Sequence, residues 1–99
     1  GIFSTDEAAP LITDSLIMHN AASNGGGILV GDQSAARIER CTIEDNTASS
    51  SGGGLAVRSF GAPTVSNCGF FKNKADSLGG AVALMDQSNS TLVDCLISD

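Results

Sequence analysis

The strongest constraint on the fold is an internal repeat of 26 to 27 residues. Cysteine recurs at a spacing of 27, at Cys41, Cys68 and Cys95, and Ser15 takes the same place 26 residues earlier. A fixed period of this length is typical of solenoids, in which each repeat stacks on the next and none buries its apolar side chains alone. The sequence therefore predicts a stack of coils.

Three further columns keep this period. An aliphatic residue stands three places before the cysteine position, a large apolar residue two places after it, and an asparagine three places further on. These columns are, in order, Ile12, Ile38, Val65 and Leu92; Ile17, Ile43, Phe70 and Ile97; and Asn20, Asn46 and Asn73. Each repeat therefore places the same kind of side chain at the same point of its coil.

A glycine-rich segment follows each asparagine and leads into a second apolar run, at 25–30, 52–57 and 79–84. Glycine permits a tight corner where a Cβ would clash. The one-residue difference in period falls between the asparagine and the glycines. Because loops tolerate such changes best, we expect a loop there.

The apolar runs have the period of β-strands. Cys41 and Ile43 alternate with Thr42 and Glu44, and Ile28 and Val30 flank Leu29, so one side of each run is predicted to face inward. Ile38 is out of phase with Cys41, which predicts a bend or bulge between two short strands. No segment has a helical pattern of useful length.

The predicted fold is all-β: a right-handed parallel β-helix of about 3.5 coils, each strand pairing with its equivalent one coil on at roughly 4.8 Å. We divide this single segment, 1–99, into a partial coil 1–10, repeats 11–36, 37–63 and 64–90, and a partial coil 91–99. Neither end shows a capping unit. We therefore expect a piece of a longer protein, its coil ends covered by the rest of that protein or by neighbouring subunits.

Stacking turns each column into a ladder. Amide side chains of Asn20, Asn46 and Asn73 are expected to bond to one another and to the turn backbone. The ladder of Cys41, Cys68 and Cys95 is interpreted as buried, inert thiols. The alternative is a Cys41–Cys68 or Cys68–Cys95 disulfide under oxidising conditions.

Charge and hydropathy exclude some partners. A net charge of −6 argues against nucleic acid and against anionic membrane surfaces, which both need a basic face. No apolar run approaches the roughly 20 residues of a membrane span, so direct membrane insertion is not expected. No signal peptide is visible within the sequence.

Candidate chemistry is sparse, and we predict no catalytic residue, no metal site and no cofactor. His19 is the only histidine and falls at an outward position. A β-helix glycosidase or lyase needs acids converging from neighbouring coils. The best cluster lies within one coil and is interpreted as a solvated face with incidental ion pairs: Arg37, Glu39, Arg40, Glu44 and Asp45.

Three further features bear on ligands and modification. Asp6, Asp32 and Asp86 share a turn column that Ser59 interrupts, which leaves too few ligands for calcium. Asn89-Ser90-Thr91 is a possible glycosylation sequon at Asn89. The glycine runs do not match a phosphate-binding loop, because no Lys-Ser/Thr follows them.

The repeat resembles that of the chlamydial-type polymorphic outer membrane proteins. Phe70-Phe71-Lys72-Asn73 matches their F-x-x-N element, and 43–46 and 17–20 match it with Ile for Phe; Gly79-Gly80-Ala81-Val82 matches their GGA[ILV] element. This resemblance implies a right-handed β-helix on a secreted or cell-surface protein, often an adhesin.

The expected function is non-catalytic: a rod-like scaffold, spacer or adhesin segment that presents a face to a protein or carbohydrate outside the cell or at its surface. One alternative is part of a carbohydrate-active β-helix enzyme, a polysaccharide lyase or hydrolase, whose active coils lie elsewhere. Another is a subunit buried in a larger assembly. A structural repeat transfers fold more safely than function.

Overall fold

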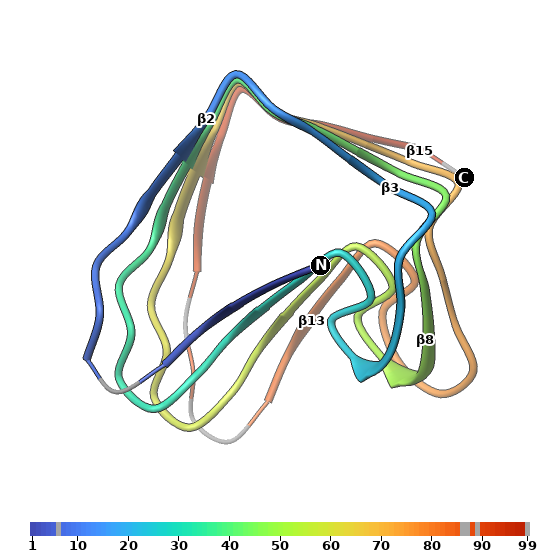
Figure 1. Ribbon diagram of the computed structural model, residues 1–99, viewed down its shortest axis with the longest axis horizontal. Helices are drawn as coiled ribbons and strands as arrows, with labels where there is room; N and C mark the ends of the chain where they lie inside the picture. The colour runs from blue at the N-terminus through green and yellow to red at the C-terminus, as the bar shows by residue number, and fades with distance from the viewer. Residues whose placement is uncertain (6, 86–87, 89, 99) are drawn as a thin grey trace.

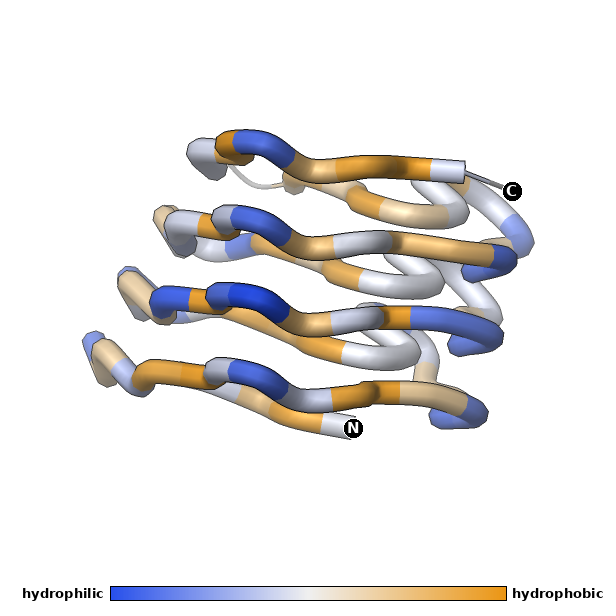
Figure 2. The backbone as a smooth tube through the Cα atoms, turned by 90° about the horizontal axis from the view of Figure 1, so that it is seen from above, coloured by the Kyte–Doolittle hydropathy of each residue, from blue (hydrophilic) through white to orange (hydrophobic). Residues whose placement is uncertain are grey.

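The chain winds through stacked coils of short strands around one axis (Figure 1, Figure 2). The computed structural model describes residues 1–5, 7–85, 88 and 90–98. Every pairing between strands is parallel and joins one coil to the next. The predicted parallel β-solenoid is therefore confirmed.

Four sheets run along the coil axis, each built from one strand per coil. The first contains β1 (Ile2–Ser4), β5 (Ile28–Val30), β9 (Leu55–Val57) and β13 (Val82–Leu84). The second contains β2 (Leu11–Thr13), β6 (Arg37–Glu39), β10 (Thr64–Ser66) and β14 (Thr91–Val93). The third contains β3 (Leu16–Met18), β7 (Thr42–Glu44), β11 (Gly69–Phe71) and β15 (Leu96–Ser98). The fourth contains β4 (Ala21–Asn24), β8 (Thr47–Ser51) and β12 (Lys74–Ala75).

The register of the sheets follows the sequence repeat. Ile12 pairs with Ile38, Ile38 with Val65, and Val65 with Leu92. The large apolar column pairs in the same way from β3 to β15, through Ile17, Ile43, Phe70 and Ile97. Residues with the same place in the repeat are thus direct neighbours between coils.

The fourth sheet was not predicted, and it forms a separate lobe beside the main coil (Figure 1). The side chains of its strands are mostly small or polar, so these strands lack the apolar alternation by which a strand is recognised in a sequence. The change of repeat length lies here: Ala22 pairs with Ala48, but Asn24 pairs with Ser51. The extra residue is therefore a bulge between paired strands, and the expected loop was wrong.

Left-handed residues turn the chain at two corners. Asp14, Arg40, Asn67 and Asp94 share one corner column, with φ between 51° and 53°. His19, Asp45 and Lys72 share the next, with φ between 53° and 57°. A single left-handed residue rotates the chain between two strands, which explains why Ile38 and Cys41 both face inward although their spacing is odd. Of the bend or bulge predicted between Ile38 and Cys41, the structure shows the bend.

The coil interior is filled with aliphatic side chains and one aromatic ring. Ile38, Ile43, Val65 and Phe70 have no solvent exposure, and Ile28, Val30, Leu55 and Val57 complete the centre of the core. Ile97, in the last coil, is 50% exposed. The apolar column is therefore covered from Ile17 to Phe70 and open to solvent at its C-terminal end.

The asparagine column closes the corner between the third and fourth sheets. Asn46 is fully buried, and its Nδ2 donates to the Ile17 carbonyl oxygen at 3.0 Å and to Asn73 Oδ1 at 3.0 Å. Its Oδ1 accepts from the backbone N–H and the Nδ2 of Asn20, at 3.0 and 3.1 Å. Both Nδ2 and Oδ1 of this buried amide therefore bond to residues of neighbouring coils.

Glycines allow the returning chain to reach this amide column. A Cβ on Gly54 would lie 2.7 Å from the Ala81 carbonyl oxygen, 2.9 Å from Phe70 Cδ2 and 3.1 Å from Asn73 Nδ2. The surrounding backbone and buried side chains cannot move away from an added Cβ. Glycine is therefore required at position 54, because the neighbouring coil approaches its Cα closely.

We predict that Gly54→Ala lowers the free energy of unfolding by about 2–3 kcal/mol, because the added methyl overpacks the coil junction. Denaturant unfolding measures this loss. Gly31→Ala is the control: its Cβ would lie 3.4 Å from the flexible Arg58 side chain. Equal stability losses in the two variants would contradict the close-approach explanation.

Replacement of the central asparagine tests the amide column. Asn46→Ala removes the partner of the Ile17 carbonyl oxygen and of the backbone N–H and Nδ2 of Asn20, so we expect a loss of about 2–4 kcal/mol in unfolding free energy. Asn20→Ala, at the half-buried end of the column, should lose less than half as much, since Asn46 keeps its bonds to Ile17 and Asn73. Thermal and urea unfolding of both variants provide the comparison, and similar losses would refute it.

Candidate interaction surface

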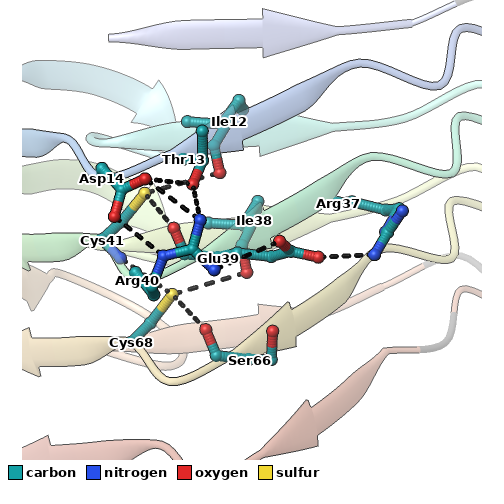
Figure 3. Close-up of polar contacts among 10 residues, drawn as sticks. All are labelled: Ile12, Thr13, Asp14, Arg37, Ile38, Glu39, Arg40, Cys41, Ser66 and Cys68. Carbon is teal, nitrogen blue, oxygen red and sulfur yellow. Dashed lines mark hydrogen bonds and ion pairs between the residues drawn. The ribbon is translucent and has the colours of Figure 1, made fainter.

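A chain of alternating charges lies on the outer face of the second sheet (Figure 3). It begins at Asp14, on the corner after β2, and continues to Arg40, on the equivalent corner after β6. Arg40 Nε donates to Asp14 Oδ1 at 2.8 Å, and a terminal nitrogen of its guanidinium donates to Oδ2 at 3.1 Å. The corner geometry places the two side chains side by side, one coil apart.

Thr13 and Glu39 extend this pair. The Arg40 guanidinium donates to Thr13 Oγ1 at 2.8 Å, and that hydroxyl donates to Asp14 Oδ2 at 2.8 Å. Glu39 Oε1 lies 3.7 Å from Arg40, while its Oε2 accepts from Arg37 at 2.6 Å. The charges of two carboxylates and two guanidinium groups therefore cancel in one network. We name this network the ionic cluster; it consists of Thr13, Asp14, Arg37, Glu39 and Arg40.

The ionic cluster corrects the expected grouping. Arg37, Glu39 and Arg40 do lie together, but Asp14 joins them from the preceding coil, so the cluster is not confined to one coil. Asp45 instead has His19 as its partner, with Nε2 3.8 Å from Oδ2. The repeat itself indicates the pairing of Asp14 with Arg40, because the two residues occupy the same corner column of successive coils.

Glu44 stands apart from these contacts. It lies on β7, and no ion pair found among residues 1–5, 7–85, 88 and 90–98 includes it. Glu44 is therefore not part of the ionic cluster. Asp14 and Glu39 both contact Arg40, whereas the paired acids of a glycosidase have to flank a bond of the substrate.

The bidentate bond from Arg40, with the Thr13 hydroxyl, lowers the pKa of Asp14 from 3.8 to about 2. The same pair raises the pKa of Arg40. Asp14 is thus ionised at every physiological pH, and it holds no proton to give to a leaving group. In this arrangement it can orient Arg40 and can accept hydrogen bonds.

The cysteine column lines the corner between the second and third sheets. Cys41 and Cys68 are buried, Cys95 is half-buried, and all three are free thiols, so neither disulfide considered from the sequence is formed. Each Sγ contacts carbonyl oxygens of its own and the preceding coil; Cys68 Sγ lies 3.2 Å from that of Ser66 and 3.5 Å from that of Ile38. Burial raises the pKa of the Cys68 thiol, which disfavours the reactive thiolate.

The acidic turn column and the possible glycosylation site are only partly described by the structure. Within the described part of the chain, no group of three or more His, Cys, Asp or Glu side chains could hold a metal ion. Asp32 accepts a hydrogen bond from Thr5. Asp6, Asp86 and the possible glycosylation site Asn89 lie outside the described residues.

One family model, described as a right handed beta helix region, matches residues 1–99. The chain belongs to this right-handed β-helix family. Neither the curated proteins nor the solved structures contain a match to the chain. Membership sets the hand of the coil seen in Figure 1, and it leaves the activity open because this fold carries many functions. No helix in the described ranges is long and apolar enough to cross a membrane.

Protonation tests the ionic cluster. The folded-state pKa of Asp14 is depressed, so the Arg40 pair stabilises the fold above pH 3.8 and this contribution is lost as pH falls towards about 2. We predict that Arg40→Ala moves the Asp14 midpoint back towards 3.8, measured by NMR of the side-chain carboxyl carbon. Arg58→Ala, which removes an arginine outside the cluster, should leave the midpoint where it was. A midpoint unmoved by Arg40→Ala would rule out the pairing.

Proposed function

We propose that this right-handed β-helix is a non-catalytic structural or interaction segment. It would act as a rod-like scaffold or spacer that presents its outer face to a protein or a carbohydrate. The observation that carries the proposal is the ionic cluster, in which two carboxylates are paired with arginines. Asp14 bonds to Arg40 of the next coil, and Glu39 is paired with Arg37 and Arg40 of its own coil.

Burial supports the same proposal. Within the described ranges the interior is filled by Ile43, Val65, Phe70 and their equivalents, which leave no channel between them for a substrate. Its outer strands are three residues long and carry mixed polar and apolar side chains. Such a surface suits recognition better than chemistry, which needs groups with tuned proton affinities.

The location we propose is the cell surface or the extracellular space. The support is the F-x-x-N and GGA[ILV] pattern, carried by 70–73 and 79–82, which resembles the polymorphic outer membrane proteins and implies an adhesin. The acidic net charge of −6 favours solubility there and disfavours nucleic acid.

Two other functions remain alternatives: a polysaccharide lyase or hydrolase whose active coils lie elsewhere in the protein, and a subunit packed inside an assembly. The first requires acids of adjacent coils that act on a substrate, whereas the acids of the ionic cluster are paired with arginines. The second requires partners on the outer faces. The complete coding sequence would distinguish the lyase or hydrolase by an acid-rich coil.

We expect no cleavage when the protein is incubated with polygalacturonate, alginate, xylan and β-glucan, with reducing ends and unsaturated products measured over a day. The reason is that Asp14 and Glu39 are both ion-paired. Asp14→Asn and Glu39→Gln serve as matched variants for any activity seen. Product release that both variants abolish would overturn the non-catalytic proposal.

A further inference from the structure

The turn between the first and second sheets forms an open depression that the ionic cluster does not touch. It has a volume of about 540 Å³ and is lined by Glu7, Asp32, Gln33, Ser59 and Phe60. We name it the turn pocket. Its volume falls within the roughly 300–1,000 Å³ of small-ligand sites.

Phe60 is the unusual residue of the turn pocket. It is 57% exposed and has a φ of 65°, beside Ser59 with a φ of 52°. The Gly61 N–H donates to the Arg58 carbonyl oxygen at 3.0 Å, so Ser59 and Phe60 are the two central residues of a tight turn. Such a turn favours Asn and Gly, and a bulky side chain is strained there.

Folding therefore does not account for this phenylalanine. Its ring buries little apolar surface, and its backbone would be better served by glycine. What the ring supplies is an apolar, flat platform in solvent, rimmed by polar groups. Aromatic rings of this kind support the apolar C–H face of a sugar ring.

The polar rim has free hydrogen-bonding capacity. Asp32 accepts a bond from Thr5, whereas the side chains of Glu7, Gln33 and Ser59 make no hydrogen bond or ion pair within the described part of the chain. Carboxylates accept from hydroxyl groups, an amide both donates and accepts, and so does a hydroxyl. This mixture complements the hydroxyl groups of a saccharide.

Charge selects the kind of saccharide. Two carboxylates, Glu7 and Asp32, face the turn pocket on a chain of net charge −6, so a uronate or sulfated glycan would be repelled. A neutral sugar suffers no such repulsion.

We propose that the turn pocket is a binding site for a neutral saccharide, with Phe60 as the stacking platform and Glu7, Asp32 and Gln33 as hydrogen-bonding groups. This proposal rests on the proposed interaction function and names its partner class. The backbone holds the site in place, since the Glu7 and Gln33 N–H groups donate to the Asp32 and Ser59 carbonyl oxygens, each at 2.9 Å. The pocket therefore spans coils that are already locked together.

The test is an NMR titration of the isotopically labelled protein with cellohexaose, xylohexaose, mannohexaose and laminarihexaose up to millimolar concentration. At least one should shift the backbone amides of Gln33 and Gly61. Phe60→Asn should raise the Kd at least about tenfold, because stacking is lost while Asn suits the left-handed turn. Gln33→Ala should weaken binding several-fold and checks the site independently.

Phe3→Ala is the matched control, because Phe3 is 58% exposed but lies outside the turn pocket. It should bind like the unmodified protein. Absence of binding to all four sugars, or binding that Phe60→Asn and Gln33→Ala leave unchanged, would overturn the proposal.

Chromatography of the same mixtures separates this proposal from the proposed function. Intact oligosaccharides with shifted amides support both. Shortened oligosaccharides overturn the non-catalytic function, while absence of binding with intact sugars overturns the saccharide site alone.

Discussion

Parallel pairing of each residue with its equivalent one coil away is the constraint on which this structure depends. It places Asn46 between Asn20 and Asn73, so that a fully buried amide finds its partners in the coils on either side. It also places Arg40 beside Asp14, so that an exposed corner is stabilised by opposite charges. Identical neighbours suit apolar and amide side chains, whereas charged positions need alternation between coils.

The repeat made much of the fold predictable, because a solenoid turns sequence period directly into contact. Ile43 and Phe70 were expected to stack, and they pair in register. The fourth sheet could not be predicted, since strands such as Thr47–Ser51 lack an apolar pattern and are held by backbone bonds to their neighbours. The ionic cluster was only half predicted, because Arg37, Glu39 and Arg40 are near one another in the sequence whereas Asp14 enters from the coil before.

Polar side chains on this molecule divide into those that join coils and those that face solvent alone. Asn46, Asp14 and Arg40 belong to the first group, and their bonds limit what chemistry they can perform. Glu7 and Gln33 belong to the second, at a turn whose backbone is fixed by its own hydrogen bonds. A rigid coil that carries unengaged groups at its turns combines a fixed frame with variable recognition.

The bulge between β4 and β8 has a consequence for how such a coil can vary. The segment from Ala48 to Ser51 is one residue longer than its partner, Ala22 to Asn24, while Ile28 still pairs with Leu55 and Ile17 with Ile43. The circumference of one coil can therefore change without any change in the alignment of the core. The lobe is thus the natural position for grafting short peptides, because a longer excursion there leaves the stacking of the remaining sides undisturbed.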